Sequence, residues 1–176
     1  MITLPGKAIG SINMIGRRLK QWNREPLPTM AAYNMYGLVL GEDRLFADAI
    51  LLRLVDAFVS GDKDIKISVI RVFLTLRHSK IQDRETRGIF SNMSEENKLE
   101  LLRRVKVVLS SDIVEFRALA LILLGCCAEI SKDVAEIRYA ILSSLSSSYV
   151  FEVRTMFAAF HAVSYTHLTL PTKRIV

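Results

Sequence analysis

The chain has 176 residues, of which 51% are hydrophobic, 8% aromatic and 24% charged, with 8 Gly and 4 Pro. This composition is that of one ordered domain, and the scarcity of aromatic residues favours aliphatic helix packing over a β-sandwich. The formal net charge of +6 is too small to require a nucleic-acid partner.

Nothing in the pattern indicates a secreted or membrane protein. Glycines and polar residues interrupt the apolar positions of residues 1–14, unlike a signal peptide. The longest apolar run, residues 118–128, would span only ~16 Å as a helix, about half of a ~30 Å bilayer core. Cys126 and Cys127 are adjacent in a predicted helix, and no further cysteines stand at metal-binding spacing. We therefore expect two buried thiols in a soluble protein of a reducing compartment.

Helical periodicity predicts four helices in the first half of the chain: residues 7–22, about 28–40, 44–60 and 63–77. In the third, the predicted stripe is Leu45, Ala49, Leu52, Val55 and Val59, widened by Phe46, Ile50, Leu54 and Phe58. In the fourth, it is Ile65, Val69, Val72, Phe73 and Leu76. Gly61 ends the third helix, and so short a link requires the two helices to be antiparallel. The basic cluster Arg17, Arg18 and Lys20 beside Trp22 is read as a solvated face rather than a nucleic-acid contact.

Residues 78–93 break the pattern with a polar, mixed-charge stretch that predicts an exposed loop. Ser94 is a good N-cap for a following helix, with Glu95 and Glu96 placed favourably against its dipole. The predicted core positions of that helix are Leu101, Leu102, Val105, Val108 and Leu109. Arg103, Arg104 and Lys106 lie off this stripe and are expected to be solvated.

The stretch from Ser111 to Glu129 is the centre of the predicted fold. Asp112 stands where a side-chain oxygen can cap a helix. Every residue from 118 to 128 is apolar or glycine, so the helix needs neighbours on more than one side. Two more helices follow, from Ser131 to about Leu145 and from residue 151 to 162. Their predicted inward residues are Val134, Ile137, Ile141 and Leu145, then Val153, Met156, Phe157 and Phe160, and the serines at 143–148 form a turn between them.

Three of these helices share a short pattern of apolar, charged, apolar and polar or basic residues. It occurs at residues 65–68, 114–117 and 151–154, with spacings of 49 positions (67 to 116) and 37 positions (116 to 153). Helix pairs near this period are typical of HEAT and armadillo arrays, and Asp112, Phe116, Arg117 and Ala120 resemble the HEAT motif best. We therefore predict an all-α chain, an α-solenoid of about four stacked antiparallel helix pairs over residues 1–162.

Residues 163–172, V-S-Y-T-H-L-T-L-P-T, abandon the helical pattern. They resemble one reading frame of a transposase adapter used to prepare sequencing libraries, and that frame gives a stop triplet after Val176. We expect residues 163–176 to be a non-native tail and exclude them from reasoning on fold and function. We expect further repeats in the native chain beyond Ala162.

Several segments resemble Integrator complex subunit 7, particularly its plant-type forms. They are L-F-A-D-A-I-L-L-R-L-V-D-A-F (45–58), G-D-K-D-I-K (61–66), E-L-L-R-R-V-K (100–106), A-L-A-L-I-L-L-G-C (118–126) and E-V-R-T-M-F-A-A (152–159). The resemblance covers roughly residues 19–162. It implies a non-catalytic scaffold in the nuclear Integrator complex, which works with RNA polymerase II in transcript cleavage and small nuclear RNA 3′-end processing. Its partners would be other protein subunits.

Two alternatives remain open from the sequence. One is a HEAT-repeat adaptor of a coat or nuclear-transport assembly in the cytoplasm. The other is a nucleic-acid-binding module, which requires the basic clusters at 17–20 and 103–106 to converge on one surface. An enzyme is not indicated, because phosphate-binding, nucleophile-elbow and zinc-protease motifs are absent. We accordingly predict no catalytic, metal-binding or cofactor-binding residues, no cofactor, no small-molecule substrate and no membrane partner.

Overall fold

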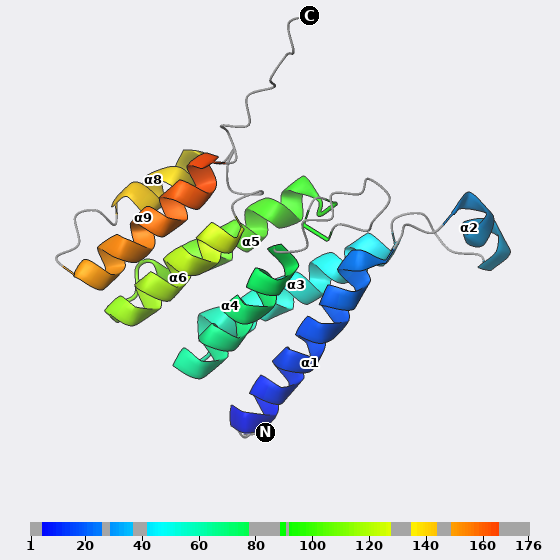
Figure 1. The fold of residues 1–176 in the computed structure, drawn as a ribbon, viewed down its shortest axis with the longest axis horizontal. Coiled ribbons are helices and arrows are strands. Elements are labelled where there is room, and N and C mark those ends of the chain that lie inside the picture. The colour runs from blue at the N-terminus through cyan, green and yellow to red at the C-terminus, as the bar shows by residue number, and fades with distance from the viewer. Residues whose placement is uncertain are drawn as a thin grey trace, which may run out of the picture.

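The fold is all-α, as predicted. The computed structural model describes residues 5–25, 29–36, 42–77, 89–90, 92–127, 135–143 and 149–165. Within these ranges every regular element is a helix and there is no strand. The helices pack side by side in a row that runs from α1 to α9, and α2 stands apart at one end (Figure 1).

Eight helices lie in the described part of the chain. They are α1 (Pro5–Arg24), α2 (Met30–Tyr36), α3 (Glu42–Ser60), α4 (Lys63–Arg77), α5 (Glu95–Val108), α6 (Val114–Cys126), α8 (Ala135–Ser143) and α9 (Val150–Tyr165). For α1, α3 and α4 the predicted bounds agree to within two residues. The predicted end of the second helix, at residues 37–40, lies outside the described residues, as do the predicted cap Ser131, Val134, Leu145 and the serines at 144–148.

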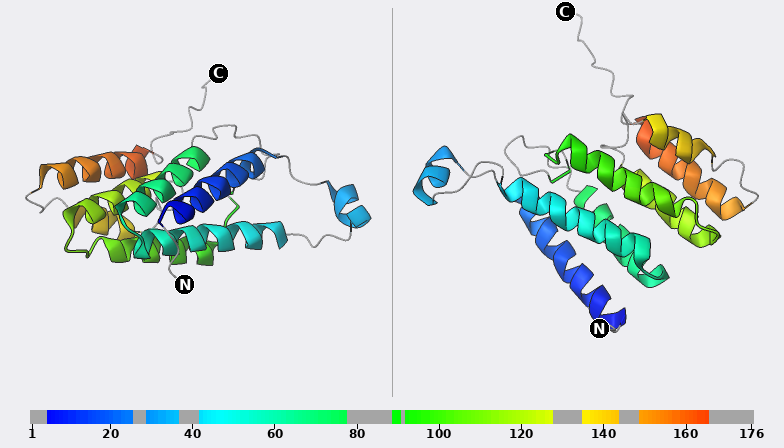
Figure 2. Two further views of the ribbon diagram at one scale, coloured as in Figure 1. Left: turned by 90° about the horizontal axis from the view of Figure 1, so that it is seen from below. Right: turned by 180° about the vertical axis from the view of Figure 1, so that it is seen from behind.

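The packed helices form two layers. In one layer α1 packs on α4, α4 on α6, and α6 on α9, while in the other α3 packs on α5 and α5 on α8. Figure 2 shows both layers from the side. The helix pairs α3/α4, α5/α6 and α8/α9 each place one helix in each layer. The predicted pairing of the first two helices is not seen, because α2 lies away from α1 (Figure 1).

Helix α6 is the inner helix of the row, as the run of apolar residues predicted. It packs against α4, α5 and α9, and eight of its thirteen residues are buried. The contact with α9 is close at Gly125, where an added Cβ would lie 3.2 Å from the Cα of Ala159. A side chain at this position would therefore push the two helices apart.

Helix α1 covers the other end of the same layer. Its buried residues, Ile12, Gly16, Leu19 and Asn23, recur every three or four positions and form one face. Gly16 allows a close approach to α4, because an added Cβ would lie 2.6 Å from a methyl group of Val72. A glycine inside a helix lowers its helix propensity, but Gly16 permits the close packing of α1 on α4.

The predicted core face of α3 was partly wrong. Leu45 and Phe46 are 66% and 64% exposed, and Ala49 is also exposed. The buried residues of this helix are Ala47, Asp48, Leu51, Leu54, Val55 and Phe58. Apolar residues stand on several sides of α3, so periodicity alone does not select the face. Packing against both α4 and α5 selects it.

The end of the predicted exposed loop is in the core. Residues 78–88 and 91 lie outside the described residues, but Ile89, Phe90 and Met93 are buried. The ring of Phe90 lies 5.6 Å from that of Phe73 in α4, measured between centroids. The prediction was wrong here because isolated apolar residues in a polar stretch carry no periodic signal.

Helix α9 continues to Tyr165, three residues beyond the predicted end at Ala162. Residues 166–176 lie outside the described residues, so the origin of the tail stays a prediction. Within α9, Val153 packs against the core, whereas Phe157 is 58% exposed and was wrongly predicted to point inward. The side chains of Met156 and Phe160 are outside the described set.

Candidate functional site

Two charged side chains that each make several polar contacts, Lys66 and Arg117, lie at the turns between paired helices. Among the described residues, no group of three or more His, Cys, Asp or Glu side chains could hold a metal ion. No helix in the described ranges is long and apolar enough to cross a membrane. Cys126 and Cys127 are both buried and carry thiols rather than a disulfide. Four of the buried polar side chains instead contact another helix; they are Asn23, Asp48, Lys66 and Glu152.

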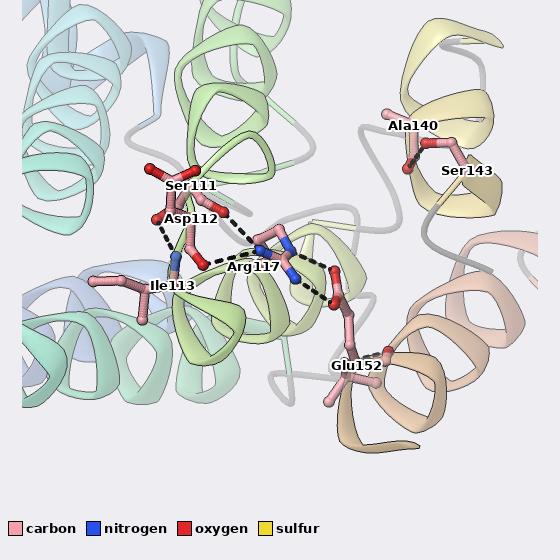
Figure 3. A network of polar contacts seen from close by, with 8 residues as sticks. Ser111, Asp112, Ile113, Arg117, Ala140, Ser143 and Glu152 are labelled. Carbon is pink, nitrogen blue, oxygen red and sulfur yellow. Dashed lines mark hydrogen bonds and ion pairs between the residues drawn. The ribbon is translucent and has the colours of Figure 1, made fainter. Parts of the chain in front are cut away.

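Arg117 connects three segments of the chain (Figure 3). It is the fourth residue of α6, and its guanidinium donates to both carboxylate oxygens of Glu152 in α9, at 2.8 and 2.9 Å. The same group donates to the carbonyl oxygens of Ser111 and Asp112, at 2.8 and 3.3 Å. The Glu152 side chain is only 4% exposed. Hydrogen bonding to Glu152 raises the pKa of Arg117 above its ordinary value.

The turn before α6 is held differently from the prediction. Asp112 was expected to cap the helix with its side chain, but the N-cap residue is Ile113, and no side-chain hydrogen bond caps it. The hydroxyl of Ser111 accepts a hydrogen bond from the amide of Ile113 at 3.2 Å. The carbonyl of Asp112, rather than its carboxylate, takes part by accepting from Arg117. The arginine therefore holds this turn from inside the helix that follows.

Lys66 holds the preceding turn in the same way. It is the fourth residue of α4 and is 1% exposed. Its ammonium donates to the carbonyl oxygens of Phe58, Gly61 and Val59, at 2.6, 2.7 and 3.2 Å. These carbonyls belong to the last turn of α3 and the residue after it, where helix carbonyls lack partners within the helix. The buried Lys66 thus supplies hydrogen-bond donors to carbonyls at the C-terminal end of α3.

Two aromatic rings also lie close to the ammonium of Lys66. Its ammonium lies 4.5 Å from the ring centroid of Phe116 in α6 and 5.3 Å from that of Phe58. Both rings present a face to the cation, an arrangement that is attractive. Burial lowers the pKa of Lys66 below its ordinary value, and the charge of Asp62 opposes this shift. Through its contact with Phe116, Lys66 also joins the α3/α4 turn to the α5/α6 pair.

Lys66 and Arg117 occupy the same position in their helices, which the predicted pattern did not align. The short pattern aligned Lys66 with Glu115, whereas counting from the first helical residue aligns Lys66 with Arg117. The first residues of α4, α6 and α9 are separated by 51 positions (63 to 114) and 36 positions (114 to 150). The pattern used residue type, and it aligns Glu115 with Glu152 but does not align the two cations that bind the preceding turns.

Ion pairs also join successive helices of the layer that contains α4, α6 and α9. Lys63 of α4 lies 3.8 Å from Glu115 of α6, and both side chains are more than half exposed. Arg117 of α6 pairs with Glu152 of α9 at 2.8 Å. In both cases the cation comes from the preceding helix and the carboxylate from the first turn of the following one. That order favours the carboxylates, because the N-terminus of a helix is partially positive.

Asp48 stabilises the beginning of α5. It is 2% exposed in α3, and its carboxylate accepts from the amide of Ser94 at 3.2 Å and from the side-chain amide of Asn97 at 2.8 Å. Ser94 is the N-cap of α5 and accepts from the amide of Asn97, as predicted. The sequence pattern missed Asp48, because an acidic residue in an amphipathic helix is ordinarily solvated.

Asn23 stabilises the end of the long loop. Its side chain is buried, donates to the carbonyl of Leu76 at 3.4 Å and accepts from the amide of Ile89 at 2.7 Å. It therefore joins the end of α1, the end of α4 and the loop. No pattern in the sequence marks an asparagine near a helix end as a contact to two distant segments.

The two basic clusters do not form one surface. Arg17, Arg18 and Lys20 are exposed on α1, as predicted. Arg103 and Arg104 lie on α5, which belongs to the other layer (Figure 2). The convergence required by a nucleic-acid-binding module is therefore absent from these described helices.

Arg104 is only partly solvated, with 32% of its side chain exposed, because it joins α5 to α3. It donates to Glu100 at 2.7 Å and to Asp56 of α3 at 2.8 Å. Hydrogen bonding between Arg104 and Glu100 raises the pKa of the arginine and lowers that of the glutamate. Arg103 is 77% exposed at its side chain and fits the prediction.

No family model, no curated protein and no solved structure matches this chain. The functional interpretation therefore depends on the sequence and on the contacts described above. Those contacts fix the positions of the helices relative to one another. The side chains that make them bind main-chain carbonyls, amides and side chains of this same chain.

Proposed function

We propose that the chain is a non-catalytic scaffold, built as an α-solenoid of HEAT or armadillo type, that holds other protein subunits of a large assembly. The observation that carries this proposal is the equivalence of Lys66 and Arg117. Each is the fourth residue of its helix, and each donates to the carbonyls of the turn before it. A contact repeated at equivalent positions is expected of a chain built from successive similar units.

The order of the helices also supports this proposal. Each of three successive pairs contributes one helix to each layer, and the ion pairs join α4 to α6 and α6 to α9. An apolar helix such as α6 cannot bury its surface within one hairpin, so its stability depends on the neighbouring pairs. Elongated arrays of this kind expose a large surface for binding other proteins.

We further propose that the assembly is the nuclear Integrator complex, acting with RNA polymerase II in transcript cleavage and small nuclear RNA 3′-end processing. The support is the resemblance of five segments, among them residues 45–58 and 118–126, to Integrator complex subunit 7. The resemblance includes residues that the structure buries, such as Leu51, Leu54 and Leu121. A packing resemblance indicates the kind of fold more directly than the choice of partners.

Co-purification tests this function. The epitope-tagged chain, expressed in plant cells, is recovered from nuclear and cytoplasmic extracts and probed for Integrator subunits, RNA polymerase II, coat proteins and import cargo. We expect Integrator subunits and polymerase in the nuclear fraction. Recovery with coat proteins or import cargo in the cytoplasm, without polymerase, would assign the chain to the alternative class of HEAT-repeat adaptor.

Two variants serve as controls. Leu121→Asp places a charge at a fully buried position of α6 and is expected to abolish recovery. Arg53→Ala changes a side chain that is 86% exposed and is expected to leave the fold intact. Equal recovery of both variants would show that the interaction does not need the folded array.

A further inference from the structure

The cations of α1 differ from those of α5 and α6 in having no partner within the described structure. In α5 and α6, four cations form ion pairs with carboxylates; they are Lys98, Arg103, Arg104 and Arg117. Helix α1 carries five cations and no acidic residue. No side chain among these five forms an ion pair or a hydrogen bond with any described residue. Helix α1 therefore keeps an uncompensated positive charge.

Three of these cations lie in one line along α1. Arg17, Lys20 and Arg24 are separated by three and then four positions, which places them on one side of the helix over about 10 Å. All three residues are exposed. The opposite edge of α1 carries Trp22, whose ring lies 6.2 Å from that of Phe46 in α3, measured between centroids. The line of cations is therefore on the side of α1 that faces away from the layer of α3.

Arg71 of α4 lies on the same outer side. Helices α1 and α4 run alongside each other in the same direction (Figure 1), because Gly16 approaches Val72 and Asn23 bonds a carbonyl in the last turn of α4. Lys66, which bonds the end of α3, projects from the other side of α4. Arg71 is exposed, and its side chain forms no ion pair with any described residue.

The two helices together form a surface that we call the basic strip: Arg17, Lys20 and Arg24 of α1 with Arg71 of α4. Arg71 precedes the contact with Gly16 by one residue and Arg17 follows it by one, so the two arginines lie at the same level of the paired helices. The acidic residue of α4, Asp64, is two turns before Arg71. No carboxylate of α1 or α4 therefore lies within the basic strip.

The basic strip lacks the features of a single-stranded nucleic-acid site. Such sites combine cations with aromatic side chains on which bases stack. Trp22, the aromatic residue of α1, is on the opposite edge of the helix against Phe46. A protein segment that carries carboxylates is therefore favoured over a nucleic acid.

We propose that the basic strip binds an acidic helix of another protein, in which carboxylates recur every three or four residues on one side, an inference that rests on the proposed scaffold function and states the chemistry of one partner. Carboxylates at this spacing repeat with the same axial rise as the cations of α1, so the two lines of charge are complementary. A second copy of this chain is disfavoured as the occupant. No helix in the described ranges carries three carboxylates at this spacing.

Fluorescence anisotropy with a designed peptide tests this inference on the full chain. The labelled probe is a helical peptide of about 18 residues, with Glu along one side and Ala and Gln elsewhere. We expect saturable binding that weakens as salt is added. The variant that combines Arg17→Glu with Arg71→Glu is expected to weaken binding about tenfold or more, since two attractions become repulsions.

A matched variant and two further probes serve as controls. Arg53→Glu combined with Arg103→Glu changes the net charge by the same amount, at side chains that are 86% and 77% exposed in the layer of α3 and α5. This variant is expected to bind within about twofold of wild type. A peptide with the same Glu residues spread around the helix is expected to bind about fivefold more weakly. A single-stranded RNA of the same net charge is expected to bind more weakly than the one-sided peptide.

Four results would overturn the inference. They are the absence of saturable binding up to about 1 mM peptide, equal weakening by the two double variants, equal binding of the two peptides, and tighter binding of the RNA that the Arg17→Glu and Arg71→Glu variant removes. The last result would assign the basic strip to a nucleic acid. Each would leave the scaffold function untouched, because the co-purification experiment measures that function independently.

Discussion

Lys66 and Arg117 hold equivalent turns in different surroundings. Both are the fourth residue of a helix, and both donate to main-chain carbonyls just before that helix. Lys66 is 1% exposed and its hydrogen bonds stay within the α3/α4 pair. Arg117 has a side chain that is 21% exposed and extends to Glu152 of the next pair.

The two residues stabilise different parts of a helical array. Lys66 stabilises the turn within one helix pair, whereas Arg117 also joins one pair to the next. An ammonium can direct its three donors at clustered carbonyls, whereas a planar guanidinium can bind a carboxylate with two parallel hydrogen bonds and still reach a carbonyl. The pKa values follow the surroundings. Burial lowers the pKa of Lys66, and hydrogen bonding to Glu152 raises that of Arg117.

The largest effect is expected from Lys66→Ala. It removes a buried side chain and leaves the carbonyls of Phe58 and Gly61 without a donor, so the free energy of unfolding should fall by about 4 kcal/mol. Lys66→Met, which keeps most of the volume, should cost about half as much. Urea unfolding measures both changes. Equal losses in the two variants would show that hydrogen bonding, rather than packing volume, dominates at this site.

Arg117→Ala should cost about 2 kcal/mol, because it leaves the buried carboxylate of Glu152 unpaired. The loss is expected to be smaller than for Lys66→Ala, since the arginine is partly exposed and water can reach part of the site. Glu152→Gln in the Arg117→Ala background should recover part of the loss. A double-mutant cycle with no coupling between the two residues would contradict the role of Arg117 in joining the pairs.

Local signals in the sequence were sufficient to predict much of this fold. The core face of α4 and the Ser94 cap were predicted correctly, because each depends on residues within one helix. The inner position of α6 followed from its uninterrupted apolar run. These signals lie within one helix, so they do not depend on how the neighbouring helices pack.

The remaining features depend on contacts between distant segments. The buried face of α3, the burial of Phe90 and the exposure of Phe157 are all decided by which helix lies alongside. The hydrogen bonds by which Lys66 and Arg117 stabilise the turns were not predicted. Their acceptors are main-chain carbonyls, which the residue type does not reveal. Alignment by residue type consequently did not match Lys66 with Arg117.

The pH dependence of stability should distinguish the two cations. The folded-state pKa of Lys66 is lowered, while its value in the unfolded chain is the ordinary 10.5. Between these values the unfolded chain binds more protons, so the free energy of unfolding rises with pH. We expect wild type to gain stability relative to Lys66→Met as the pH rises toward 10.5. Urea unfolding at several alkaline pH values measures the difference, and a relative loss of wild-type stability would contradict the burial of a lysine with a lowered pKa.

The smallest effect is expected at the exposed ion pair between Lys63 and Glu115. It joins α4 to α6 as Arg117 and Glu152 join α6 to α9, but its atoms are 3.8 Å apart and both side chains are more than half exposed. Lys63→Ala should therefore change the free energy of unfolding by less than about 0.5 kcal/mol, and added salt should remove the change. A loss similar to that of Arg117→Ala would mean that pairing itself, and not burial of the carboxylate, determines how strongly successive helices are joined. Urea unfolding at low and high salt, with Arg117→Ala measured alongside, separates these two causes.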